Sequence, residues 1–182
     1  MTIVKTTFVF LASFLSLGLQ AKTSETWMLK TSHAEYTAKH LAHNTRGKSQ
    51  SAKGKIECSD LCRGLLAIEM KSFDSENSNR DLHMQEITHA AQHPYVTLRL
   101  EGPRDTTQWN EKNVTGKVQL SGTEKPIQFQ SLKVAKVAGE LKMQATFVVS
   151  LTEFGVERPS LLGVSVDDNV ELAVSGAWSS SL

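Results

Sequence analysis

The chain has 182 residues, 40% of them hydrophobic, and an almost even charge balance of 20 Lys and Arg against 19 Asp and Glu. This length is enough for one domain with a sizeable hydrophobic core. The even balance and the lack of a long basic run give no surface of the kind that attracts phosphates, so nucleic acid is not an expected partner.

The first 21 residues are predicted to be a cleaved signal peptide. Lys5 precedes an uncharged run over residues 6–19, and the small residue Ala21 closes it. The run is shorter than the ~20 apolar residues that span a bilayer, and its charged, apolar and small parts are typical of secretion signals. We expect cleavage after about Ala21, a mature domain over residues 22–182, and a periplasmic or secreted location. An uncleaved membrane tether is the alternative.

The only two cysteines, Cys58 and Cys62, are expected to form a disulfide, because a nearby pair in an exported chain is usually oxidised. The bridge would close a very short loop and fix a turn. The spacing is not that of a Cys-x-x-Cys redox motif, and there is no second cysteine pair to complete a zinc site. We therefore expect neither a redox role nor a bound metal.

Alternation of apolar and polar residues predicts about eight strands. The clearest runs from Leu141 to Leu151, and a phase slip near Ser131 and Leu132 predicts a β-bulge. Trp109 lies in a polar, turn-rich connection and is expected to be exposed. The stretch 45–56 is polar and rich in glycine, which predicts one strongly bent strand. The other predicted strands cover residues 27–29, 33–40, 63–73, 95–101, 114–120, 127–132 and 170–178.

One helix is predicted near residues 78–91. Ser78 followed by Asp81 forms a weak capping box, and Pro94 is expected to end the helix. Arg80 and Asp81 invite a catalytic interpretation, but an acidic residue in a first turn complements the helix dipole and the neighbouring arginine can hold the adjoining loop. We therefore assign Ser78, Arg80 and Asp81 a structural role, and no residue a catalytic one.

Together these elements predict a mainly β fold with one crossing helix. The strands are apolar on one side only, which suits an antiparallel sheet that either packs on a second sheet or curls into a barrel. The interior of an eight-stranded barrel is filled by side chains or holds one small ligand. Composition and periodicity leave both interiors open.

Several short motifs along the chain are informative through their order and spacing. They are residues 27–29 with His33 and Tyr36, then 73–75, 79–84, 93–98, 114–127 and 152–156. In these stretches the chain resembles the YceI-like family of exported lipid-binding domains. The resemblance implies a lipocalin-like barrel that holds a polyisoprenoid, such as an isoprenoid quinone, or a similar amphiphile for transport or storage, without cofactor or chemistry. Two stretches depart from the family pattern: residues 87–90 lack its usual aromatic residues, and Leu151 stands where a basic residue is common.

The inward faces of the predicted strands define the expected lumen. They carry no charge, and only two of their side chains, Tyr36 and His40, offer polar groups, as an apolar ligand with a small head group requires. The residues expected to line the lumen are Tyr36, His40, Met70, Phe73, Leu98, Phe129, Met143, Phe147, Phe154 and Trp178.

Two other functions are weighed against lipid binding. His83, His89 and His93 lie in or just after the predicted helix, which raises an enzymatic or metal-dependent activity on such a lipid. A structural or stress-related domain with a filled core is the second, and the exposed Trp109 would be its contact with a protein partner. A transient membrane contact and a homodimer are left open.

Overall fold

The structure is a computed structural model that describes residues 24–41, 43–161 and 163–181. The predicted signal peptide and its cleavage point lie outside these residues. Helical elements are η1 (Met70–Ser72), α1 (Ser78–Ile87), η2 (Thr106–Gln108) and η3 (Thr152–Phe154). Strands are β1 (Glu25–Ala38), β2 (Thr45–Ser49), β3 (Lys53–Cys58), β4 (Leu61–Glu69), β5 (Tyr95–Pro103), β6 (Thr115–Leu120), β7 (Thr123–Ile127), β8 (Phe129–Val137), β9 (Glu140–Ser150), β10 (Ser160–Leu161), β11 (Val164–Ser165) and β12 (Asn169–Ser181).

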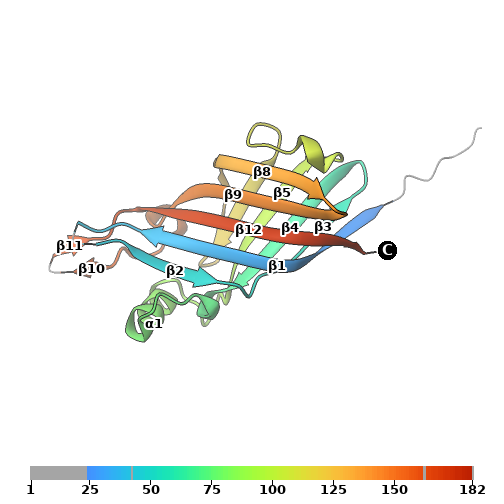
Figure 1. Cartoon of the computed structure of the whole chain (residues 1–182). Helices are drawn as coiled ribbons and strands as arrows, with labels where there is room; N and C mark the ends of the chain where they lie inside the picture. Colours follow the sequence, from blue (N-terminus) through green and yellow to red (C-terminus); the bar gives the residue numbers. More distant parts are fainter. Residues whose placement is uncertain (1–23, 42, 162, 182) are drawn as a thin grey trace, which may run out of the picture.

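Ten of the described strands form one antiparallel sheet in the order β7-β6-β5-β4-β3-β1-β12-β9-β8, with β2 also paired to β1. The sheet curls around a common interior, and α1 lies across one end of it (Figure 1). In the described part of the chain no backbone ladder joins β7 to β8, so the sheet is a half-barrel. The predicted fold class, mainly β and antiparallel with one α-helix, is confirmed for these residues.

Strand β1 is one long strand, although its sequence predicted two short segments. The pairing of β1 with β12 shifts between Leu29 and Thr31, which marks a bulge at Lys30. A bulge adds one residue and moves the following side chains to the opposite face. Trp27 therefore points inward before the bulge and Ala34 after it, and this change of phase hid the continuity.

The polar stretch 45–56 forms two strands instead of one bent strand. Strand β2 pairs with the second half of β1, from Ala34 to Ala38, whereas β3 pairs with its start, from Glu25 to Met28. The sheet does turn a corner in this stretch, as predicted. The chain makes the corner with a break between β2 and β3 instead of a bend within one strand. The bulge predicted near Ser131 is present, because the register of β8 on β9 shifts between Phe129 and Ser131.

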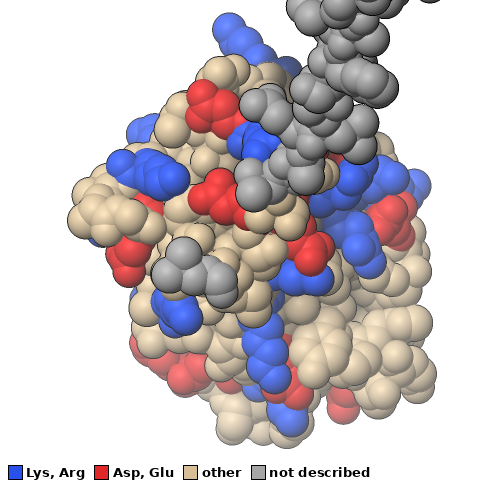
Figure 2. All heavy atoms as spheres, turned by 90° about the vertical axis from the view of Figure 1, so that its right-hand side faces the viewer, with Lys and Arg blue, Asp and Glu red and all other residues tan. Residues whose placement is uncertain are grey.

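The end of the barrel away from α1 is filled. Four of the largest fully buried side chains of the described residues lie together there, because Trp27 is paired with Ile56 and Trp178 with Leu141. Cys58 and Cys62 lie directly opposite each other on β3 and β4, are buried, and are joined by a disulfide, as the sequence predicted. Figure 2 shows this end of the molecule, where basic and acidic side chains lie among one another.

The prediction that Trp109 is exposed was wrong, because only 3% of its surface is accessible. Its indole N–H donates a hydrogen bond to the Pro103 carbonyl at 2.8 Å. Its ring packs so closely over Gly102 that a Cβ atom there would lie 2.9 Å from the indole nitrogen. The polar connection thus folds back on the sheet, and Trp109 offers no surface for a partner.

Candidate functional site

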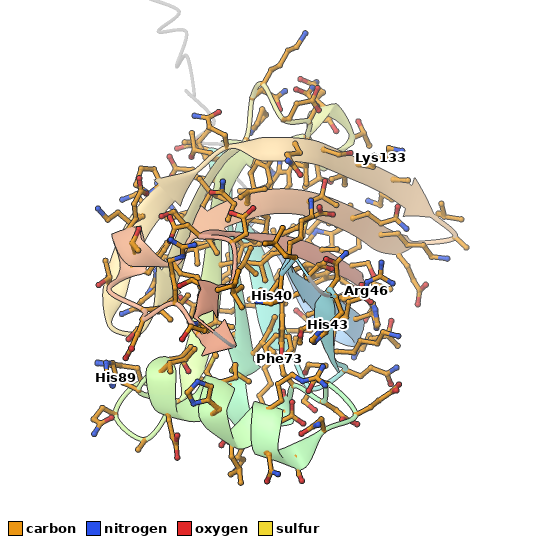
Figure 3. All side chains as sticks on the ribbon, turned by 90° about the vertical axis from the view of Figure 1, so that its left-hand side faces the viewer. His40, His43, Arg46, Phe73, His89 and Lys133 are labelled. Atoms are coloured by element: carbon orange, nitrogen blue, oxygen red, sulfur yellow. A yellow bond between two sulfur atoms is a disulfide. The ribbon has the colours of Figure 1, made fainter. Side chains whose placement is uncertain are left out.

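A pocket of about 180 Å³ lies at the α1 end of the half-barrel, between the sheet, α1 and the segment that follows β9. Figure 3 looks at this end, with α1 along the bottom of the view and Phe73 above it. Its polar lining residues are Tyr36, Thr45, Arg80, His83 and Thr88. Its apolar lining residues are Ala38, Met70, Phe73, Met84, Ile87, Val96, Leu120, Val149, Leu151, Val156, Pro159, Val166, Val170 and Leu172.

One wall of the pocket is a single face of α1. The residues that line it are Arg80, His83, Met84 and Ile87, at relative positions i, i+3, i+4 and i+7. This spacing places four side chains on one side of an α-helix. Because the helix has no fully buried residue, it contributes this face to the pocket while most of its surface stays in solvent.

The helix begins at Ser78, as the sequence predicted, but Ser78 is its first residue and not its cap. Asn77 is the N-cap, and its side-chain oxygen accepts a hydrogen bond from the Arg80 backbone N–H at 3.1 Å. The Asp81 carboxylate reaches past the cap and accepts from the Ser75 N–H at 3.1 Å. The assignment of Ser78 to the cap is therefore corrected, because Asn77 is the cap and its backbone carbonyl already accepts from the Asp81 N–H at 3.0 Å.

The predicted helix is also longer than the observed one. Helix α1 ends at Ile87, well before Pro94. Thr88 closes its last turn by donating its hydroxyl to the Met84 carbonyl at 2.7 Å, and His89 takes a left-handed conformation with φ of 52°. A left-handed residue just past the last turn is a common way to end a helix. The proline is therefore not what stops it.

Tyr36 forms the polar part of the β1 wall. Its ring lies against Gly47 of β2, where any Cβ atom would collide with it, and 5.6 Å from the ring of Phe73 between centroids. Burial raises the pKa of the Tyr36 hydroxyl above its ordinary value, the Asp81 carboxylate raises it further, and Arg80 opposes them. The hydroxyl is therefore protonated at neutral pH and able to donate a hydrogen bond.

The connection from β9 to β12 forms the wall opposite α1. It starts with η3, where Gly155 takes a φ of 70° and lets the chain turn back, and continues through the β10–β11 hairpin. Asp168 ties its two ends together by accepting from the Ser150 hydroxyl at 2.5 Å and from the Thr152 N–H at 3.0 Å. These hydrogen bonds lower the pKa of the Asp168 carboxyl, so the carboxylate that holds them is ionised.

Three of the ten residues predicted for the lumen, Tyr36, Met70 and Phe73, line the pocket. His40 lies at the same end, where its Nε2 hydrogen-bonds with the Val164 carbonyl at 3.1 Å, outside the lining. The other six are buried in the filled core and do not line the pocket: Leu98, Phe129, Met143, Phe147, Phe154 and Trp178.

The alternation of apolar and polar residues showed which side chains of each strand point inward. It did not show how far along the barrel axis each residue lies. The missed lining residues come mainly from α1, from the β9–β12 connection and from strand ends. For α1 a signal existed, because residues 80, 83, 84 and 87 follow helical spacing. Leu151 and Ile87, noted as departures from the family pattern, both lie in the lining.

The helix histidines are not brought together. His83 points toward the pocket and lies 3.6 Å from the Glu86 carboxylate, whereas His93 packs against Gly122 in the β6–β7 turn. In the described ranges, no group of three or more His, Cys, Asp or Glu side chains is placed to hold a metal ion. Those ranges also contain no helix that is long and apolar enough to cross a membrane.

Comparison with solved structures finds the same fold at low sequence identity. BcnA of Burkholderia cenocepacia aligns with a TM-score of 0.67 at 16% identity, over 80% of this chain and 95% of BcnA. A Saccharophagus degradans structure, described as a polyisoprenoid binding domain implicated in plant cell wall breakdown, aligns with a TM-score of 0.68 at 13% identity, over 85% of this chain and 98% of that one.

A third structure, the YceI protein of Campylobacter jejuni, aligns with a TM-score of 0.54 at 18% identity, over 79% of this chain and 90% of that one. Comparison with curated proteins gave no match. A family model, that of the YceI-like domain, matches residues 27–177, which is most of the chain. The protein therefore belongs to the YceI-like domain family.

Proposed function

We propose that this protein binds an amphiphile with one apolar chain in the pocket beneath α1, and that a polyisoprenoid is the leading candidate. The observation that carries the proposal is the pocket itself, a vacant space walled almost entirely by apolar side chains. The description of the similar Saccharophagus degradans structure as a polyisoprenoid binding domain supports the choice of ligand. The free energy of binding would come mainly from removing the apolar chain from water, about 0.8 kcal/mol per buried methylene.

The size of the pocket limits how much of a long chain it encloses. An engineered protein cavity of ~150 Å³ holds one benzene molecule. A pocket of about 180 Å³ accordingly takes roughly seven carbon atoms, or one to two isoprene units. A longer chain would extend beyond the rim, or α1 and the β9–β12 connection would move apart to admit it.

We propose binding without chemistry. The Asp81 carboxylate, next to the lining residue Arg80, is engaged by the Ser75 N–H, and His83 lies 3.6 Å from Glu86. The described lining residues include no Ser, Cys or Lys that His83 could activate as a nucleophile. The role that follows is transport or storage of the amphiphile.

We also propose that the protein is exported, with a signal peptide removed after about Ala21. The charged, apolar and small-residue order of residues 1–21 supports it, and the disulfide between Cys58 and Cys62 suits an oxidising compartment. N-terminal sequencing of the protein from its natural host should give a start near Lys22. A protein that retains Met1 would overturn the cleavage.

Isothermal titration with geraniol, farnesol and geranylgeraniol tests the proposed ligand class. Binding is expected for all three, with little gain in affinity beyond geraniol, because the pocket encloses at most two isoprene units. Solvent extraction of the purified protein followed by mass spectrometry should also release an amphiphile. No binding of any of the three, together with no extracted lipid, would refute the proposal.

A pocket-filling variant tests the location. Ala38 is small, half-buried and part of the lining, so Ala38→Trp should occupy the vacant space and weaken farnesol binding at least tenfold. The matched control is Ala135→Trp on β8, where Ala135 is exposed and paired with the exposed Lys142. Equal affinity in the two variants would place the ligand somewhere else.

A further inference from the structure

The pocket has a marked charge asymmetry. Among the described residues that line it, Arg80 is the only side chain that carries a full charge at neutral pH, and none of them is Asp, Glu or Lys. His83, the only other titratable nitrogen there, lies 3.6 Å from Glu86. The pocket wall is therefore apolar with a single positive group.

The guanidinium of Arg80 is left without an acidic partner. Arg80 is half-buried, and its backbone N–H makes the helix-capping hydrogen bond to Asn77. The neighbouring Asp81 carboxylate is held by the Ser75 N–H at 3.1 and 3.3 Å. Within the described part of the chain no ion pair reaches Arg80. A half-buried cation without a partner costs solvation energy, which an anionic ligand group would restore.

A neutral donor stands beside this cation. Tyr36 lines the same pocket from β1, and burial keeps its hydroxyl protonated by raising its pKa. Its ring lies against Gly47 and packs at 5.6 Å from the Phe73 ring, which restricts its movement. Close by, the buried Ser75 side-chain oxygen lies near enough to the Tyr36 hydroxyl to oppose the rise of its pKa.

We propose that Arg80 and Tyr36 form a head-group subsite that selects amphiphiles with an anionic oxygen head, a carboxylate or a phosphate. This inference rests on the proposed function and adds the chemical class of the head group. The apolar tail would lie against apolar lining residues such as Val149 and Val156, while the oxyanion accepts hydrogen bonds from the guanidinium and the phenol. It also gives Arg80 a role other than the structural one that the sequence predicted.

Three probes with eight carbon atoms in the chain are used: octanol, octanoate and octyl phosphate. They separate the effect of head-group charge on affinity from the effect of tail burial. Titration of the intact mature protein should show that Arg80→Gln lowers the affinity for at least one anionic probe about tenfold or more. The affinity for octanol should change less than about twofold, because its tail contacts are unaltered. Tyr36→Phe should act in the same direction with a smaller loss.

The matched control is Arg99→Gln on β5, which removes an arginine that is exposed and paired with Glu124 outside the pocket. It should leave all three affinities unchanged. A loss confined to octanoate identifies a carboxylate head, and a loss confined to octyl phosphate identifies a phosphate head.

Equal changes for all three probes in Arg80→Gln, or no change for any, would overturn the subsite while leaving tail binding intact. If the folded parent protein bound none of the three, the proposed function would fail and the subsite with it. The octanol measurement therefore distinguishes the two failures.

Discussion

Tyr36 connects the fold to the pocket through three contacts. Gly47 has no side chain and lets the ring lie flat against β2, Phe73 packs at 5.6 Å, and the hydroxyl lies near the charged residues at the start of α1. A larger residue at position 47 would displace the ring, and the only polar donor of the β1 wall would move with it. One backbone position without a Cβ atom thus sets the shape of the polar end of the pocket.

Titration of Tyr36 should start only above the ordinary tyrosine range. Tyr36 and Tyr95 are the only tyrosines in the sequence, so Tyr95→Phe leaves one phenol to follow by its absorbance near 295 nm. We expect a midpoint above 10, because burial and Asp81 both raise the pKa of Tyr36. Its contribution to stability is complete below pH 10 and is lost as the pH rises through its own pKa. A midpoint at or below 10 would show that the phenol is solvated.

Asn77, and not Ser78, should be the residue whose loss frays α1. Asn77→Ala removes the side-chain oxygen that accepts from the Arg80 N–H and should cost about 1 kcal/mol of helix stability. Hydrogen exchange of the α1 amides measures this directly. Ser78→Ala is the matched control and should change the same amides by less than about 0.5 kcal/mol. The reverse order of the two effects would restore Ser78 as the cap.

At the scale of elements, α1 and the β9–β12 connection act as opposite walls that the sheet alone does not provide. The helix contributes one side-chain face, and the connection is held at its two ends by Asp168. Neither wall is part of the main sheet, so either can move without breaking a ladder of that sheet. Complete enclosure of a chain longer than two isoprene units would require such a movement.

Asp168 should make the β9–β12 connection sensitive to acid. Hydrogen bonds from Ser150 and Thr152 lower the pKa of its carboxyl, so its contribution to stability is present above about pH 4 and is lost as the pH falls through the lowered value. We expect the exchange protection of the Thr152 amide to fall in that range. Asp168→Asn should reduce the protection at neutral pH and remove this dependence on pH.

The exposed Glu171→Gln is the control for Asp168. The Glu171→Gln variant should show the same exchange protection of the Thr152 amide, with the same pH dependence, as the parent protein. The reason is that no described hydrogen bond or ion pair involves the Glu171 side chain. If both variants matched the parent protein in Thr152 protection, Asp168 would not be the residue that holds the connection.

Sequence periodicity predicted elements best where one face is cleanly apolar. Strand β9 follows its predicted range almost residue for residue, and the bulge near Ser131 appears where the phase slips. It failed where a bulge reversed the phase, at Lys30, and where a tertiary contact decided burial, at Trp109. The phase reversal at Lys30 was interpreted as a break between two strands, and the hydrogen bond from Trp109 to Pro103 leaves no mark in the alternation of apolar and polar residues.

Taken as a whole, the molecule divides the interior of its half-barrel between two uses. Trp27, Trp178 and Leu141 fill one end, and the α1 end is left vacant. The sequence predicted the inward faces but allowed a filled or a hollow interior, and the structure has both, at different heights. The packed end stabilises the fold, which lets the other end remain open without the loss of a core.

The position of a bound chain tests this account most directly. A crystal structure of the mature protein with farnesol should show the hydrocarbon beneath α1, in contact with Met84, Val149 and Leu172, and leaving the pocket past the rim. The filled end around Trp27 and Trp178 should be unchanged. Density for the hydrocarbon outside this pocket, or a vacant pocket in protein that binds farnesol in solution, would contradict the central claim.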